Sequence, residues 1–419
     1  MIYNIFEEKE KGSYTPGFFL MKVSFPFDTN NLSELSPEDL GTFAHEYVHF
    51  LQNTSTPYGL WQAMVFYQAI AEFFSFVQKN KPSELPVKDY SPSDTMKKRI
   101  DLEKEASGFR GFLDIPESQT LDINCNTVDV HGEKIKQITL GFQDVHGTPY
   151  DIVLGANIIK ESMAAMVQEI IDPESQSSHL AMPYHIVERI ASQITPKIKD
   201  DTKKLIALCF ISLHTLYPGK TLIDYMSYAN NNPEQDILAN FEHFIKDSKV
   251  FTNKGEMTIE QLGDDIVETY KNTVQNFLYG KDSDRKLEYL AEVLDRVKLS
   301  NGMIPLLRLL TEHDINAELL QRAVDACGTP VIWNDLGNIS IPNTVDNAKG
   351  EEKPDMEIWA LFANQSLYQR MIDERQHVCP MFSMCHGFKL SNTKGECYDL
   401  PWQGSECIMT MIGHSLGLQ

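Results

Sequence analysis

The chain has 419 residues, a hydrophobic content of 42% and a formal net charge of −22 at pH 7. This composition excludes a disordered chain, and the length suffices for two or three hydrophobic cores. The acidic balance argues against binding to nucleic acid or to an anionic membrane, because either partner needs a basic face. The first residues lack the basic start and apolar core of a secretory signal, and no apolar run suggests a membrane span. We therefore expect a cytoplasmic protein.

A strand and a buried helix are expected near the N-terminus. Residues 18–25 have the pattern of a strand. Ser36 then supplies an N-cap and Pro37 the first helical position, with acidic residues in the first turn. From there a helix can run through Gln52 and stop in residues 53–57. Its side chains are apolar nearly all round, which predicts that it lies in the core.

The sequence His45-Glu46-Tyr47-Val48-His49 lies in the middle of this helix. Residues four apart share a helix face, so His45 and His49 can bind one ion together. Glu46 lies about 100° round the helix, where it can hold a water molecule but is badly placed to be a ligand. Buried imidazoles are costly unless they are paired or bound to a metal. Two core histidines satisfied by backbone carbonyls are the alternative; we favour half of a catalytic zinc site.

Downstream, the pattern predicts helices around one small sheet, and therefore an α+β fold. The expected elements are a long apolar helix over 60–79, a Pro/Ser-rich break over 82–92, a charged helix over 93–108, a small sheet over 120–153 with turns at His131-Gly132 and His146-Gly147, helices over 155–326, an exposed linker over 346–355, and a helix with a Cys-bearing tail. We divide the chain into a catalytic region (1–172, with an insertion at about 80–150), a mainly helical region (173–345) and a C-terminal helix and tail (356–419).

A catalytic zinc site normally has three protein ligands and a water, so a third ligand is needed. Gln52 and Ser55 stand where the metzincin arrangement requires Gly and His, which excludes that arrangement. Glu72 is well spaced from His49, but on an antiparallel helix it would be displaced by roughly 15 Å, at 1.5 Å per residue. Glu161 lies in the second turn of an apolar helix whose Ala164 and Ala165 permit close packing. We favour Glu161, with Glu72, another acid or His185 as alternatives.

The segment around Glu161 resembles the Glu-Gly-x-Ala signature of gluzincins, with Ser162 where Gly is usual and Ala164 in its expected place. Together with the His45 to His49 motif, it makes the chain similar to a zincin-type metallopeptidase of the gluzincin kind. The similarity covers only these two helices. It implies a zincin-like N-terminal catalytic region in which His45, His49 and Glu161 hold Zn²⁺ and Glu46 is the general base.

The same resemblance implies a peptide or protein substrate held along a strand edge, either Phe19 to Ser24 or Thr139 to Phe142. Tyr184 and His185 are the candidates for transition-state stabilisation. Gln52 shares a face with both motif histidines, so it is either their outer partner or an ordinary polar residue at a helix end.

The C-terminal tail contains a second group of candidate ligands. Its members are Cys379, Cys385, Cys397 and Cys407, with His377 and His386 interleaved. Their spacings match no standard zinc or iron–sulfur pattern, so a second metal, disulfides and unlinked thiols all stay open. Disulfides are the weakest of these in a reducing compartment. Cys125, Cys209 and Cys327 have the pattern of isolated core residues.

Two other functions compete with a peptidase. One is a zincin-derived interaction protein that binds a metal or a peptide without turnover, and the other is a zinc hydrolase of non-peptide amides or esters. Glu46 favours an enzyme, because a binding module needs no base beside its ligands. The sequence does not separate the two classes of hydrolase, and it leaves room for a protein regulator.

Overall fold

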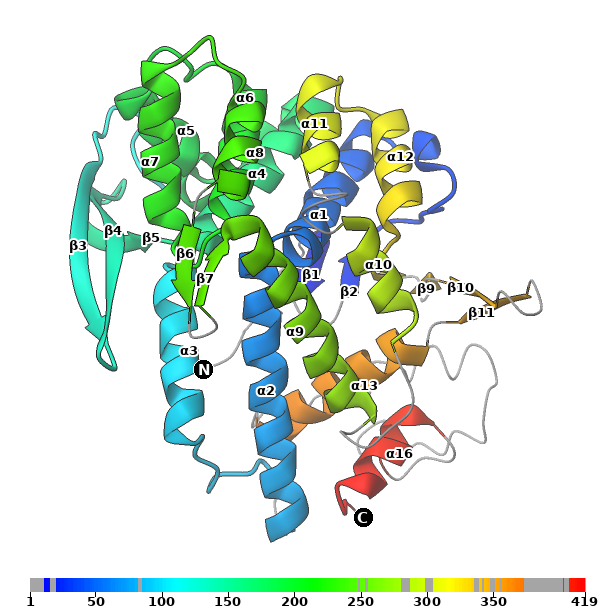
Figure 1. Cartoon of the computed structure of the whole chain (residues 1–419). Helices are drawn as coiled ribbons and strands as arrows, with labels where there is room; N and C mark the ends of the chain where they lie inside the picture. The colour runs from blue at the N-terminus through cyan, green and yellow to red at the C-terminus, as the bar shows by residue number, and fades with distance from the viewer. Residues whose placement is uncertain are drawn as a thin grey trace.

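Helices dominate the computed structural model of the chain, and short strands form small sheets beside them (Figure 1). The structure describes residues 11–15, 20–81, 85–247, 249–252, 255–279, 287–297, 304–334, 339–340, 343–346, 351–354, 356–372, 402 and 407–418. About 62% of the structure is helical and 14% is strand, in small sheets, which confirms the predicted α+β class.

Helix α1 (Pro37–Ser55) begins at the cap that the sequence predicts, and α2 (Pro57–Asn80) follows it after one residue, three residues earlier than the expected start at 60. The Ser36 hydroxyl accepts a hydrogen bond from the Asp39 N–H at 3.2 Å. Thr56 caps α2 in the same way by accepting from the Gly59 N–H at 3.0 Å, and its hydroxyl also donates to the Gln52 carbonyl. One threonine thus ends α1 and starts α2 at the bend between them.

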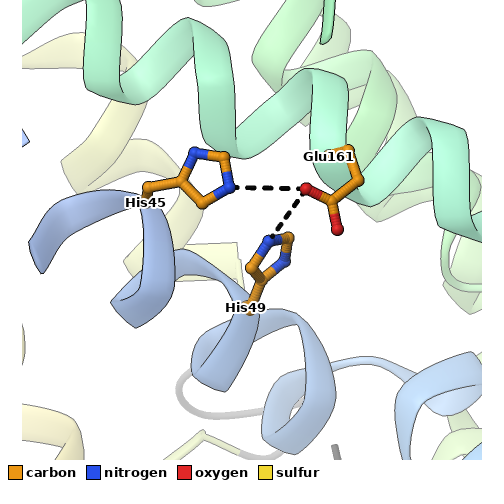
Figure 2. Close-up of side chains that lie close together, drawn as sticks. All are labelled: His45, His49 and Glu161. Atoms are coloured by element: carbon orange, nitrogen blue, oxygen red, sulfur yellow. Dashed lines mark ion pairs between the residues drawn. The ribbon is translucent and has the colours of Figure 1, made fainter. Parts of the chain in front are cut away.

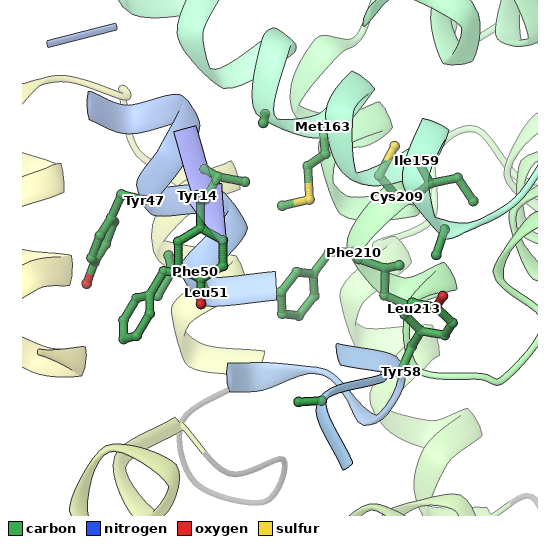
Figure 3. Packing of buried hydrophobic residues seen from close by; sticks show 14 of the residues in the cluster. Tyr14, Tyr47, Phe50, Leu51, Tyr58, Ile159, Met163, Cys209, Phe210 and Leu213 are labelled. Carbon is green, nitrogen blue, oxygen red and sulfur yellow. The ribbon is translucent and has the colours of Figure 1, made fainter. Parts of the chain in front are cut away.

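The core is built around α1 (Figure 3). Tyr47 and Phe50 of α1 are buried, as are Met163 of α4 (Ala156–Ile171) and Phe210 of α6 (Thr202–Ser212). Because α4 packs along α1, the second half of the expected site lies beside the first. The buried, nearly all-apolar helix predicted from the sequence is confirmed.

The sheet next to α1 has the strand order β1-β2-β8-β9. Its strands are β1 (Gly12–Thr15), β2 (Leu20–Val23), β8 (Val331–Asn334) and β9 (Ile339–Ser340). The predicted N-terminal strand is β2, which pairs antiparallel with β1 and parallel with β8. Segments about three hundred residues apart along the chain therefore share the sheet.

The predicted small sheet is an antiparallel meander of β3 (Asp122–Val130), β4 (Glu133–Gln143) and β5 (Pro149–Leu154). Its first turn places His131 and Gly132 at positive φ, as the His-Gly pattern predicts. The Gly155 N-cap of α4 follows β5 directly, so this sheet leads into the helix that carries Glu161.

The other elements are mostly helices. They are η1 (Leu32–Glu34), α3 (Asp94–Ser107), η2 (Pro173–Ser178), η3 (Ala181–His185), α5 (Ile186–Ile194), α7 (Pro218–Asn231), α8 (Ile237–Asp247), β6 (Lys249–Thr252), β7 (Gly255–Thr258), α9 (Ile259–Tyr279), α10 (Tyr289–Val297), α11 (Ile304–Glu312), α12 (Ala317–Cys327), β10 (Asn343–Asp346), β11 (Glu351–Pro354), α13 (Met356–Ile372) and α16 (Ile408–Ser415).

Three expectations need correction. The β6–β7 hairpin, which was not predicted, interrupts the stretch expected to be almost wholly helical. The predicted linker contains β11, which pairs with β10 in a second hairpin. Cys125 is exposed on β3, whereas Cys209 and Cys327 are buried as expected. Cys379, Cys385 and Cys397 lie outside the described residues, and Cys407 is a free thiol that caps α16.

Helix α2 is the one helix in the described part of the chain that is long and apolar enough to cross a membrane, contrary to the sequence expectation. However, 61% of its apolar window is buried inside the protein, where α2 packs against α9 and α1. This burial is that of a core helix and is consistent with a soluble protein. One cluster of buried residues contains side chains from all three predicted regions, and the boundaries between those regions stay a prediction.

Candidate metal centre

Three side chains from α1 and α4 converge on one point (Figure 2). The Nε2 atoms of His45 and His49 each lie 3.4 Å from the same oxygen, Oε2 of Glu161. His45 and His49 face α4 because they are one helical turn apart on α1. Glu161 faces α1 because α4 packs along it. The structure thus brings together the three residues that the sequence singles out as ligands.

The spacing of these donor atoms suits a small divalent ion. A tetrahedral ion with bonds of about 2.1 Å holds its ligand atoms about 3.4 Å apart. Two imidazoles and one carboxylate are also a donor set that zinc accepts. The Glu161 side chain keeps 35% of its surface exposed, whereas the two histidines are about one-tenth exposed. The three residues could therefore hold a metal ion on a side that solvent reaches.

Gln52 fixes the orientation of His49. The amide of Gln52 donates from Nε2 to the Lys160 carbonyl at 3.1 Å, which assigns its oxygen to the bond with His49 Nδ1 at 2.9 Å. Since that oxygen can only accept, Nδ1 of the imidazole carries a hydrogen, and Nε2 is the nitrogen that faces Glu161. Gln52 therefore makes the contact with His49 that the first of the two predicted alternatives requires.

Replacing Gln52 by Leu is expected to weaken zinc binding about 10- to 100-fold, the usual cost of losing an outer partner of a ligating histidine. Competition with a chromophoric chelator measures this affinity. Gln62→Leu is the matched control, since Gln62 is also a buried helical glutamine but bonds Lys160 Nζ and Glu103 instead of a histidine. Equal affinities in both variants would contradict the orienting role.

Burial and mutual attraction set the charges in the triad. Burial raises the pKa of Glu161, but His49 and His45 outweigh it and hold the pKa well below its usual range, so the carboxylate is ionised at neutral pH. Burial lowers the pKa of His45, only partly offset by the hydrogen bond to Glu161. For His49, burial also works to lower the pKa, but Glu161 raises it more. The site therefore supplies one negative charge and two imidazoles, which matches the needs of a divalent cation.

The chain was compared with protein-family models, curated proteins and solved structures. None of them matches. The proposed chemistry of this centre therefore depends on the geometry of the triad and the residues around it.

Glu46 belongs to α1, and its side chain lies against strand β1. The residue is 7% exposed, and its carboxylate is close enough to His49 to raise the pKa of that imidazole. A Cβ at Gly12 of β1 would come within 2.8 Å of Glu46 Cγ and 3.0 Å of Glu46 Oε1. The absent side chain at Gly12 thus allows the strand backbone to lie directly against this carboxylate.

Tyr184 borders the triad, as predicted for a residue that assists the reaction. Its ring centroid lies 6.0 Å from that of His45. The segment around it is anchored to α4 by Ser162, whose hydroxyl donates to the Pro183 carbonyl at 2.6 Å. Leu113 and Met182 hold the same segment through paired backbone hydrogen bonds. Ser162, the residue that departs from the gluzincin signature, therefore has a structural use here.

His185 follows Tyr184 in the sequence, and its imidazole pairs with two glutamates outside the triad. Its Nδ1 is 3.0 Å from Glu188 Oε2 and its Nε2 is 3.6 Å from Glu169 Oε1. His179, which the sequence analysis missed, lies between, with its ring 4.6 Å from Tyr184 and 6.5 Å from His45. No sequence pattern pointed to His179, since it lies in a short connection between η2 and η3 rather than on a patterned helix face.

Two sequence-based alternatives are wrong. Glu72 lies on α2, where its carboxylate accepts hydrogen bonds from the backbone N–H and hydroxyl of Ser93, the N-cap residue of α3, so it holds the start of α3 instead of joining the triad. Neither predicted substrate edge is an edge, because β2 lies between β1 and β8, and β4 lies between β3 and β5. In the described part of the chain, the strand edge beside Glu46 belongs to β1.

Proposed function

We propose that the chain is a zinc-dependent metallohydrolase, and specifically a peptidase. The observation that carries this proposal is the convergence of His45, His49 and Glu161 with a buried acid, Glu46, one residue from a ligand. A metal-binding module needs the three ligands alone. The additional carboxylate suits hydrolysis, in which a base must take a proton from water.

His45, His49 and Glu161 would hold the ion. When bound, zinc supplies Lewis acidity that polarises a carbonyl and lowers the pKa of water to about 7. Glu46 then accepts a proton from the attacking water and delivers it to the leaving amine. Gln52 keeps the Nε2 of His49 available, and the exposed side of Glu161 leaves room for water and substrate.

The β1 edge suits an extended peptide. An edge strand offers backbone N–H and C=O groups to an added strand. Since Gly12 brings this backbone against Glu46, a peptide paired with β1 would run past the base and the ligands. Phe112, which is 56% exposed and 6.0 Å from Tyr184 by ring centroid, would contact a substrate side chain beside Tyr184.

Tyr184→Phe is expected to lower kcat about 10²-fold while zinc content stays unchanged. The reason is that a hydroxyl donor aimed at a developing oxyanion is worth roughly that factor. Steady-state kinetics and metal analysis of the same preparation measure both quantities. Tyr150→Phe, a half-buried tyrosine on β5, is the control. A fall in kcat that is matched by loss of zinc would instead make Tyr184 a structural residue.

Incubation of the zinc-loaded protein with a peptide library, followed by mass spectrometry of the products, tests the proposal. Parallel incubations use small amide and ester substrates. Cleavage of peptides that stops in Glu46→Gln supports the peptidase. Cleavage confined to esters or small amides would favour the other class of hydrolase. Peptide binding without cleavage would favour an interaction protein.

A further inference from the structure

A second group of two histidines and a glutamate lies beside the first, in the segment that joins α4 to α5. Glu169 is in the last turn of α4, His179 follows η2, and His185 ends η3. One donor atom from each of the three lies within 4.8 Å of the other two. We propose that Glu169, His179 and His185 form a second metal site, which binds a divalent transition-metal ion such as Zn²⁺.

The donor atoms of this group meet at one oxygen. Oε1 of Glu169 lies 2.8 Å from Nδ1 of His179 and 3.6 Å from Nε2 of His185. These separations bracket the roughly 3.4 Å that a tetrahedral zinc ion imposes on its ligands. The three side chains are between 10% and 18% exposed, so the group is sheltered but can be reached by an ion. Its donor set is the same as that of His45, His49 and Glu161.

Glu188 gives His185 the outer partner that a ligating histidine needs. Its Oε2 lies 3.0 Å from His185 Nδ1, one turn along α5. Because a carboxylate accepts, the imidazole carries a hydrogen on Nδ1 and directs Nε2 at Glu169. Glu188 thus orients His185 as Gln52 orients His49 in the first site. An ion pair between His179 and Glu169 alone would not need His185 to be oriented in this way.

The position of the second site gives it a role. An ion there would bind the segment carrying His179 and His185 to the end of α4. The His179 ring stacks on Tyr184, whose ring contacts His45. The second ion would therefore hold Tyr184 against the first site. Metal binding by this group does not depend on whether the first site hydrolyses peptides.

Metal counting on single and double variants tests the proposal. Wild type, Glu169→Gln, His185→Ala, His49→Ala and the Glu169→Gln/His49→Ala double variant are loaded with Zn²⁺, desalted and analysed by mass spectrometry. Each single variant should lose one equivalent relative to wild type, and the double variant two. His131→Ala is the control, because His131 also pairs with a carboxylate, Asp101, but belongs to no three-ligand group in the described residues.

Using differences between variants cancels any zinc held by cysteines of the tail. Glu169→Gln preserves the shape of the side chain, and circular dichroism identifies any variant that fails to fold. Glu188→Leu, which removes the acceptor for His185 Nδ1, should weaken only the second ion, by about 10- to 100-fold in a chelator titration. Unchanged zinc in folded Glu169→Gln, with one equivalent lost in His49→Ala, would overturn the second site and leave the proposed function standing. Unchanged zinc in His49→Ala would overturn the first site instead.

Discussion

Glu161→Gln is expected to remove zinc from the first site and to abolish hydrolysis. The amide keeps the volume of the side chain but lacks the charge that balances a divalent ion between His45 and His49. Loss of one of three ligands should reduce affinity by at least about 10²-fold, more than the usual loss of an outer partner. Metal analysis after dialysis against a weak chelator, with peptidase assays on the same samples, measures both effects.

Glu72→Gln is the matched control for Glu161→Gln. Glu72 is the other acid with suitable spacing in the sequence, but its carboxylate binds Ser93, the N-cap residue of α3. Its replacement should lower stability slightly and leave zinc and activity as in wild type. If Glu72→Gln lost the metal and Glu161→Gln kept it, the assignment of the third ligand would be reversed.

Glu46→Gln is expected to keep zinc and lose activity. Glu46 lies beside the ligands rather than among them, so its loss removes a base without removing a bond to the ion. General acid–base catalysis contributes about 10²- to 10⁴-fold, and kcat should fall by that amount. Kinetics with zinc-saturated protein measure the change.

The control for Glu46→Gln is Glu38→Gln, an acid in the first turn of the same helix whose side chain is 63% exposed. It should behave as wild type. Activity preserved in Glu46→Gln would exclude Glu46 as the base. Zinc lost from Glu46→Gln would mean that the residue supports the ligands instead.

The metal-ligating residues of the first site were predictable because their positions depend on local helix geometry. Caps at Ser36 and the apolar face of α1 fix the helix, and helical periodicity then fixes how His45 and His49 point. Glu161 was predictable from its place in an apolar helix with alanines one turn along. Gln52 was predictable as a residue on the histidine face, although only the structure chose between its two possible roles.

The surroundings of the ligands could not be predicted, because they depend on contacts that leave no local pattern in the sequence. β1 is the edge strand beside Glu46 because β8, about three hundred residues away in the sequence, pairs with the other side of β2. Nothing within residues 18–25 indicates that partner. His179 reaches the site through a connection without periodicity. Glu72 looked suitable by spacing alone, yet its carboxylate satisfies the start of α3. Long-range pairing and capping decided these points.

Anomalous diffraction at the zinc absorption edge tests the first metal site most directly. Crystals of zinc-loaded protein, measured above and below the edge, should show an anomalous peak about 2.0–2.2 Å from Nε2 of His45, Nε2 of His49 and a carboxylate oxygen of Glu161. An ordered triad without such a peak in those crystals, with Oε2 of Glu161 still bonded to both imidazoles, would contradict the account.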